Sequence, residues 1–252
     1  GVMAMHYGSL QMAERFSTLT ALFGNRIDTG LGRAPGGDML SAHALNQGQV
    51  VRPEAIDSLI AETVEFVRGT LPPTHPYAKV VVTPTGQIQP QTWLLGSSGQ
   101  SAVWAAEHGM DYAYAQFFTG HQSTGIMDHY RAHLADGFPG RTLSAVCVSA
   151  APTRQEALDQ SLMAANFRVS LGTGRPVAFV TASQMDADTR SLLTNYVLSN
   201  EDTIFVGDYD EVADKLTAFQ DAHHVDELML ISYIDDVQVK VEQYRQLAKR
   251  LI

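Results

Sequence analysis

Apolar and polar residues recur along the chain with two periods, one typical of amphipathic helices and one typical of buried strands. Within residues 9–23, one helical face collects Leu10, Ala13, Phe16, Leu19, Thr20 and Phe23, with Ser9 as the N-cap. Residues 52–69 repeat the helical period between Pro53 and Gly69, which are typical first and last residues of a helix. Two amphipathic helices are therefore expected early in the chain.

Five continuous apolar runs predict buried strands, over residues 26–32, 92–96, 111–118, 142–150 and 226–231. Helical patterns separate or follow these runs, over residues 97–109, 123–137, 153–170, 187–200, 210–224 and 235–252. Strands that alternate with helices are typical of a parallel α/β fold. Because no linker or low-complexity tract interrupts this pattern, residues 1–252 are expected to form a single domain.

The composition is that of an ordinary globular protein, with 45% hydrophobic and 17% charged residues. The formal net charge is −10, and no basic stripe interleaves with aromatic residues, which argues against binding to nucleic acid. No apolar run approaches the ~20 residues of a membrane span, so no membrane partner is expected. The single cysteine, Cys147, lies in an expected strand and can form no intrachain disulfide, which favours a structural role and a cytoplasmic location.

The segment RIDTGLGRAPGGD, residues 26–38, combines a strand end with four glycines and Arg33. Glycine lets backbone N–H groups approach a ligand, and arginine suits a phosphate. The spacing resembles a dinucleotide-binding fingerprint, but no helix is expected before residue 53 and no acidic residue lies near position 50. A phosphate-binding turn and a tight turn with a solvent-facing arginine both remain open.

A second segment, LLGSSGQSAVWAAEHG, reads as a strand, a small-residue turn and a helix that begins near Ser98. The unpaired N–H groups of a helix's first turn bind anions well. Ser98 can cap this helix, and Ser101 is expected to point its hydroxyl at the same place. Since consecutive parallel strands end side by side, Arg33 and this helix could bind one phosphate together. The alternative is that Ser98 only caps its helix.

These segments resemble those of the bacterial luciferase-like flavin monooxygenases. The stretch GVMAMHYGSLQMAERFSTLTALFGNRIDTGLGRAPGGD is similar to the family's run around its fourth strand, and WLLGSSGQSAVWAAEHGMDYAYAQFF to its fifth strand, helix and sixth strand. GDYDEVADKLTAFQDAHHVDELMLIS is similar to its last helix and eighth strand. The resemblance covers essentially all 252 residues and implies a (β/α)8 TIM barrel that binds FMN at the carboxyl ends of its strands.

The resemblance also implies which residues bind the cofactor. Arg33 aligns with the arginine that contacts the FMN phosphate. Ser98 and Ser101 align with the phosphate-binding turn, which Ser97 precedes, and Gly1 and Val2 align with a backbone segment beside the isoalloxazine ring. Family members use reduced FMN from a separate reductase, together with O₂, to oxidise an organic substrate. The catalytic residues are not identified. The helix over residues 9–23 is expected to contribute to a homodimer face, as in relatives; the alternative is that its apolar residues only pack on the barrel.

This sequence departs from the family in having five expected barrel strands where the family has eight. Three βα units, including an "EHH"-like segment with a histidine implicated in catalysis, are expected to be missing before Gly1, so the barrel domain 1–252 is expected to be incomplete at its N-terminus. The leading hypothesis is a flavin-dependent monooxygenase with an unidentified substrate. The alternative is a flavin-binding or structural remnant without catalysis.

Two other features are of lesser weight. His129 and His133 lie four residues apart on one expected helix, but neither a neighbouring glutamate nor a third ligand accompanies them, so no metal site is expected. Residues 171–184 are expected to form a loop in which Gly172 and Gly174 act as hinges, at a place where the family has a mobile lid. A surface loop without a role is the alternative.

Overall fold

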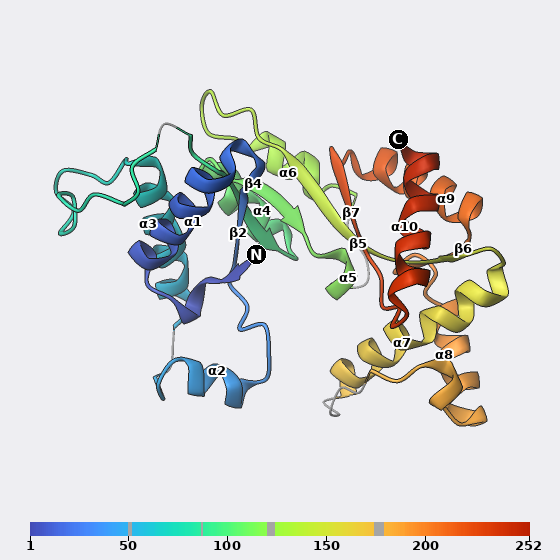
Figure 1. Cartoon of the computed structure of the whole chain (residues 1–252). Coiled ribbons are helices and arrows are strands. Elements are labelled where there is room, and N and C mark those ends of the chain that lie inside the picture. Colours follow the sequence, from blue (N-terminus) through green and yellow to red (C-terminus); the bar gives the residue numbers. More distant parts are fainter. Residues whose placement is uncertain (50–51, 87, 120–123, 174–178) are drawn as a thin grey trace. The chain divides into compact units, whose positions relative to one another are not determined.

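Strands and helices alternate along the chain and divide into two compact units in the computed structural model (Figure 1). The first unit comprises Gly1–Ala113 and His129–Arg141, and the second comprises Tyr114–Asp128 and Thr142–Ile252. The described residues are 1–49, 52–86, 88–119, 124–173 and 179–252. The alternation and the parallel strand pairing confirm the predicted α/β class, whereas a single barrel domain over residues 1–252 stays a prediction.

Parallel strands form the centre of the first unit. β1 (Val2–Met3) pairs with β2 (Asp28–Gly32), and β2 pairs with β3 (Gln91–Gly96), which is followed in the strand order by β4 (Asp111–Tyr114). Val2 lies opposite Leu31, and Leu31 lies opposite Leu94. Leu31 and Leu94 are buried, so the register places the apolar side chains of adjacent strands together in the core.

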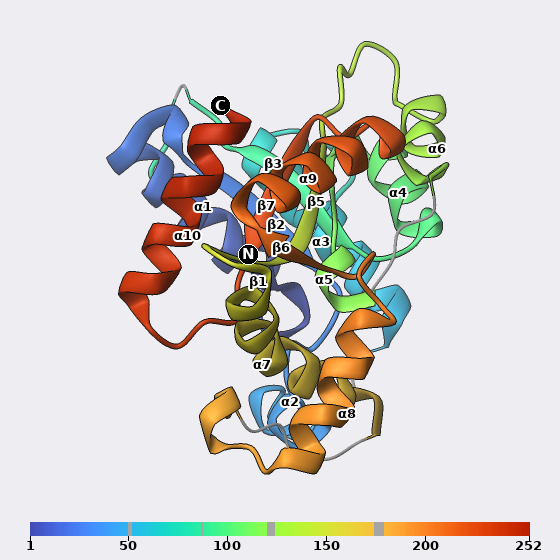
Figure 2. The ribbon, with the colours of Figure 1, turned by 90° about the vertical axis from the view of Figure 1, so that its right-hand side faces the viewer.

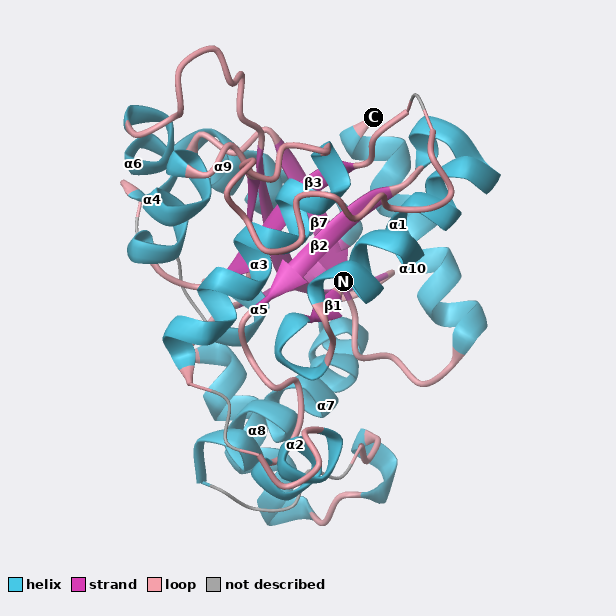
Figure 3. Ribbon diagram, turned by 90° about the vertical axis from the view of Figure 1, so that its left-hand side faces the viewer, coloured by secondary structure: helices cyan, strands magenta, loops and turns pink. Residues whose placement is uncertain are grey.

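The longest helices of the first unit are α1 (Ser9–Phe23) and α3 (Pro53–Arg68), which pack against each other beside the strands (Figure 3). Met12 and Phe16 of α1 and Ile60 of α3 are buried. Leu19 and Phe23, which the helical period placed on the same face, are exposed instead. The buried stripe of α1 begins at Ser9 and passes through Met12, Ala13, Phe16 and Thr20, so it is rotated from the predicted one.

Shorter elements complete the first unit. They are the 3₁₀ turns η1 (Ala4–His6) and η2 (Gly24–Arg26) and the helices α2 (Met39–Leu45) and α4 (Gly99–Glu107). Helix α6 (Ile126–Ala132), whose residues divide between the two units at Asp128, lies where the helix over 123–137 was predicted, but it is shorter. Helix α2 was not expected, since residues 39–52 show no sustained helical period; its first turn is held by Asp38, whose side chain accepts a hydrogen bond from the Ser41 backbone N–H.

The second unit is built on β5 (Thr142–Ala151), which pairs in parallel with β6 (Ile204–Asp208) and with β7 (Glu227–Ile231). Cys147 lies opposite Ile204 in one pairing, and Leu143 lies opposite Glu227 in the other. All ten residues of β5 are buried, as the continuous apolar run TLSAVCVSA predicted.

Helices cover both faces of β5. Cys147 and Ala151 pack with α7 (Arg154–Thr173) and α8 (Ala187–Leu198), whereas Val146, Val148 and Ala150 pack with α9 (Tyr209–His223) and α10 (Val237–Leu251). Figure 2 shows α7 and α8 together, apart from α9 and α10. The two sets alternate along β5 because successive side chains of a strand point to opposite faces. Burial raises the pKa of the Cys147 thiol to about 11, which fits the structural role predicted for it.

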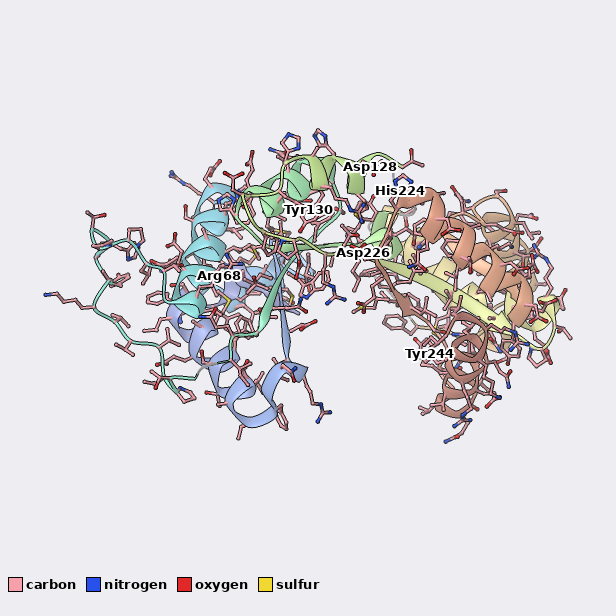
Figure 4. All side chains as sticks on the ribbon, turned by 90° about the horizontal axis from the view of Figure 1, so that it is seen from above. Arg68, Asp128, Tyr130, His224, Asp226 and Tyr244 are labelled. Carbon is pink, nitrogen blue, oxygen red and sulfur yellow. The ribbon has the colours of Figure 1, made fainter. Side chains whose placement is uncertain are left out.

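A side chain fixes the start of β5 against β7. Asp226, which directly precedes β7, accepts hydrogen bonds from the backbone N–H and the hydroxyl of Thr142, both at 2.7 Å (Figure 4). In return, the Asp226 backbone N–H donates to the Thr142 hydroxyl at 3.1 Å. Nearby in the sequence, His224 adopts a left-handed conformation at the end of α9 and pairs with Asp128 at 2.8 Å.

The described residues contain seven strands rather than the five expected. The additional strands are β1 and β6, which are short. The expected strand 111–118 was wrong in its second half, because β4 ends at Tyr114 and α5 (Gln116–Thr119) follows. Periodicity cannot separate a short buried strand from a buried helical turn in a run as apolar as this one. The Gln116 side-chain amide donates to the Asp202 carbonyl oxygen at 3.0 Å, which gives this polar residue a buried place in the second unit.

Candidate functional site

The carboxyl ends of β1, β2 and β3 lie side by side in the first unit. Met3 lies opposite Gly32 at the ends of β1 and β2, and Gly32 in turn lies opposite Leu95, one residue before the end of β3. Arg33 directly follows β2, and Ser97 directly follows β3. The register therefore brings together the two segments that the sequence singled out. We call Arg33, Ser97, Ser98 and the first turn of α4 the phosphate edge.

The glycine-rich segment after Arg33 passes closely over β1. Gly36 has a φ of +72°, and a Cβ atom there would overlap the side chain of Met3, so this position requires glycine. His6 lies beside the same segment, with its Nε2 3.0 Å from the Pro35 carbonyl oxygen and its Nδ1 3.1 Å from the Asn46 amide nitrogen. Because a carbonyl oxygen only accepts, Nε2 carries the proton and Nδ1 accepts from Asn46.

Ser98 is the N-cap of α4 and is exposed. Its hydroxyl accepts a hydrogen bond from the Ser101 backbone N–H at 3.2 Å, as predicted for a cap. The next two backbone N–H groups, of Gly99 and Gln100, belong to the first turn, where a helix offers them no intrahelical acceptor. Ser97 is exposed beside them. The amino end of α4 thus presents unpaired donors and the positive end of the helix dipole to solvent.

Ser101 places its hydroxyl 3.2 Å from that of Ser98, as expected, and accepts a hydrogen bond from the Ser98 backbone N–H at 3.3 Å, but it does so from the buried side of the turn. It is 4% exposed; its Oγ donates to the Ser98 carbonyl oxygen at 2.7 Å and lies 3.0 Å from the Tyr112 hydroxyl. The Tyr112 hydroxyl also donates to the Ser98 carbonyl oxygen, at 2.9 Å. Ser101 therefore stabilises the turn between β3 and α4 from its buried side. A direct contact between Ser101 and a phosphate stays a prediction.

Arg33 has two partners that were not predicted from the sequence. Its Nε lies 2.6 Å from Oδ1 of Asp57 on α3, and its guanidinium lies over the ring of Trp104 on α4, 5.0 Å from the ring centroid. Nε and Oδ1 are not aligned as a hydrogen bond, so the contact is an ion pair. Asp57 is 24 positions from Arg33, and Trp104 read only as a helical apolar residue; no local pattern links the three.

Gly1 and Val2 lie at the start of β1, on the strand that borders the phosphate edge. A Cβ atom on Gly1 would lie 3.3 Å from the Leu95 side chain, so the backbone of Gly1 passes close to β3. Val2 is half-buried and Gly1 is exposed. Their role beside a flavin ring stays a prediction.

A cavity of about 710 Å³ lies at the opposite, amino ends of β2 and β3. It is lined by apolar side chains of α1, α3 and the segment 71–90, among them Phe66, Leu71 and Val81. Arg68 borders it and donates to the Gly109 carbonyl oxygen and to the Thr92 hydroxyl, so its charge serves the fold (Figure 4). Burial lowers the pKa of Arg68. None of the residues of the phosphate edge lines this cavity.

The remaining expectations concern residues outside the phosphate edge. His129 and His133 stack edge to face with ring centroids 4.6 Å apart, and the described part of the chain has no group of three metal-ligating side chains. The expected loop 171–184 is helical at its start, because α7 continues through Gly172 to Thr173; Gly174 lies outside the described residues. Among the described helices, none is long and apolar enough to cross a membrane.

Comparison with known proteins connects this geometry to a family. The sequence profile described as "Luciferase-like monooxygenase" matches residues 1–224. The N-acetyl-S-alkylcysteine monooxygenase of Bacillus subtilis is 32% identical over 258 aligned residues, which cover 100% of this chain and 76% of that protein.

Solved structures agree with this match. The crystal structure of apo-MsnO8 superposes with a TM-score of 0.81 at 30% identity, over 99% of this chain and 76% of that one. The oxygenating constituent of 3,6-diketocamphane monooxygenase from Pseudomonas putida, solved in complex with FMN, shares the fold with a TM-score of 0.61 at 14% identity, over 99% of this chain and 76% of that one. This chain therefore belongs to the luciferase-like monooxygenase family, and it is a flavin-dependent monooxygenase with that family's parallel α/β barrel fold.

Proposed function

We propose that this chain binds FMN with the phosphate at the phosphate edge and uses the reduced flavin and O₂ to oxidise an organic substrate. The observation that carries this proposal is the convergence of Arg33 and the exposed first turn of α4 at adjacent strand ends. In a chain of net charge −10, this edge gathers a guanidinium, two unpaired N–H groups and two exposed serine hydroxyls. That donor set suits a phosphate monoester.

Each group of the phosphate edge would contribute differently to FMN binding. Arg33 supplies the charge, and the N–H groups of Gly99 and Gln100 supply directed donors that cost no side-chain entropy. Ser97 and Ser98 can donate from their exposed hydroxyls. Gly1 and Val2 would place backbone beside the isoalloxazine ring, and Ser101 would hold the turn that receives the phosphate. When bound, reduced FMN supplies the electrons for inserting one oxygen atom of O₂ into the substrate.

The family suggests which substrates and partners to test first. The relative from Bacillus subtilis is named for N-acetyl-S-alkylcysteine, so S-alkyl thioethers of this kind are the first substrates to test. A separate flavin reductase would supply reduced FMN. We also propose a cytoplasmic homodimer: the buried, unpaired Cys147 suits a reducing compartment, and α1 exposes Leu22 and Phe23, at 69% and 50%, as apolar contacts.

Titration of the protein with FMN and with riboflavin, followed by flavin fluorescence, tests the phosphate assignment. Riboflavin has the same ring system but no phosphate. We expect Arg33→Ala to weaken FMN binding by about 1.5–3 kcal/mol, as for a charge-assisted hydrogen bond, and to leave riboflavin binding unchanged.

The matched control is Arg26→Ala. Arg26 lies in η2 at the amino end of β2, at the opposite edge of the same strands, and is exposed. Equal FMN affinities of wild type and Arg33→Ala would rule out the phosphate edge. A preparation that binds FMN but never oxidises a thioether in the presence of a flavin reductase would instead favour the alternative, a flavin-binding protein without catalysis.

A further inference from the structure

Arg33 is held at two places on its guanidinium. Its Nε is paired with Oδ1 of Asp57 at 2.6 Å, and its planar group lies over Trp104. The two paired atoms are themselves shielded from solvent, although the side chains are 30% and 38% exposed overall. A contact shielded in this way holds the guanidinium more firmly than an exposed ion pair does.

Trp104 is in turn fixed in place. Its ring stacks on His108 at 3.9 Å with an interplanar angle of 15°, and His108 Nδ1 lies 2.8 Å from the Trp104 carbonyl oxygen. The indole is therefore a supported surface on α4, the helix whose first turn belongs to the phosphate edge. Because Asp57 lies on α3 and Trp104 on α4, the two contacts anchor Arg33 from two different helices.

The contacts leave one part of the guanidinium available. Asp57 occupies the Nε side and Trp104 the flat face, whereas Nη1 and Nη2 have no protein partner among the described residues. These two nitrogens form the edge through which arginine binds phosphate oxygens in a bidentate way. An arginine held in advance also loses less side-chain entropy when the ligand binds.

We infer that Asp57 and Trp104 are positioning residues, which hold Arg33 with its Nη1 and Nη2 edge directed to the FMN phosphate. This inference rests on the proposed function. It assigns to both residues a role in selecting FMN over flavins without a phosphate. Because both residues act through Arg33 in this inference, the affinity for riboflavin should not depend on them.

The test compares the dissociation constants of FMN and riboflavin for Asp57→Asn, Trp104→Leu and Trp104→Phe. We expect Asp57→Asn and Trp104→Leu to reduce the preference for FMN about 5- to 10-fold, with riboflavin affinity within 2-fold of wild type. Trp104→Phe keeps an aromatic face for the guanidinium and should restore most of the preference. The control is Glu54→Gln, which removes an exposed carboxylate from the first turn of the same helix α3.

Each outcome has a distinct meaning. If Arg33→Ala leaves the FMN preference intact, the proposed phosphate site is wrong and the positioning role falls with it. If Arg33→Ala abolishes the preference but Asp57→Asn and Trp104→Leu keep it, only the positioning inference is overturned. Tighter FMN binding by Asp57→Asn would also overturn it, since Asp57 would then compete with the phosphate for Arg33. A drop in riboflavin affinity equal to that in FMN affinity would show a merely structural role.

Discussion

Gly96 is the last residue of β3. The space that a side chain at this position would need is occupied by Ser101 of α4 and Tyr112 of β4. A Cβ atom at this position would lie 2.8 Å from Cβ of Ser101 and 3.0 Å from the Tyr112 ring. This close approach lets the Ser101 hydroxyl and the Tyr112 hydroxyl meet beneath the turn. The absence of a side chain at Gly96 thus allows the conformation of the segment from Gly96 to Ser101, which contains Ser97, Ser98 and the first turn of α4.

We expect Gly96→Ala to destabilise the protein by about 1–3 kcal/mol, because Ser101 and Tyr112 must shift to make room for the added methyl group. Urea denaturation measures the effect. The matched control is Gly99→Ala, three residues later on the same turn, where a Cβ atom meets nothing within 4 Å. A Gly96→Ala protein as stable as Gly99→Ala would show that the turn is looser than its packing indicates.

Helix α1 shows how an element can be predicted in extent and missed in orientation. Its range, Ser9–Phe23, matches the predicted residues 9–23, but Gly8 and not Ser9 is the N-cap, and Leu19 and Phe23 lie outside the buried stripe. Together with Leu22 they leave the last turns of α1 with three large apolar side chains that are 41–69% exposed. Apolar side chains gathered on one exposed helix end are typical of an interaction surface.

If this surface forms the proposed homodimer, a charge placed in it should separate the subunits. We expect Leu22→Glu to shift the protein from dimer to monomer in sedimentation velocity at micromolar concentration, since a buried unpaired carboxylate is strongly unfavourable. The control is Leu40→Glu, at an exposed position of the separate helix α2. A wild-type monomer, or a dimer that survives Leu22→Glu, would contradict the use of α1 as the dimer face.

At the scale of the whole molecule, the dominant electrostatic quantity is the net charge of −10. The proposed ligand is an anion, so the general field of the protein repels the phosphate that the phosphate edge attracts. Repulsion between distant charges is screened by salt, whereas the close contacts of Arg33 are screened less. Long-range and local electrostatics therefore oppose each other, and salt separates them.

We expect the association rate constant of FMN, measured by stopped-flow fluorescence, to rise about 2- to 5-fold between roughly 0.01 M and 0.15 M ionic strength. Riboflavin carries no phosphate and serves as the control, with a rate that stays constant. A rate for FMN that falls with added salt would show instead that the local positive field of the phosphate edge extends into solution and outweighs the net charge.

The sequence by itself determined the fold class, the order of the elements and the family. The alternation of apolar runs with helical periods was enough for the fold class and the order, because strand and helix periods depend on local side-chain direction, whereas the family came from the resemblance of three quoted segments. It also placed Arg33 and Ser98 at neighbouring strand ends, since parallel pairing of consecutive strands follows from the order of the elements. Some elements were not predicted: β1, α2 and α5 are too brief for a period to emerge, and β6 was missed although it is as long as β2 and β7.

Only the tertiary structure decided what surrounds the phosphate edge. Asp57, Trp104 and Tyr112 reach it from α3, α4 and β4, at sequence separations that no local pattern spans. The inward turn of Ser101 depends on the absence of a side chain at Gly96, five residues earlier. The identity of a residue thus limits what it can bind, but its direction and its partners are set by packing between elements distant in the chain, and that packing exists only in the folded state.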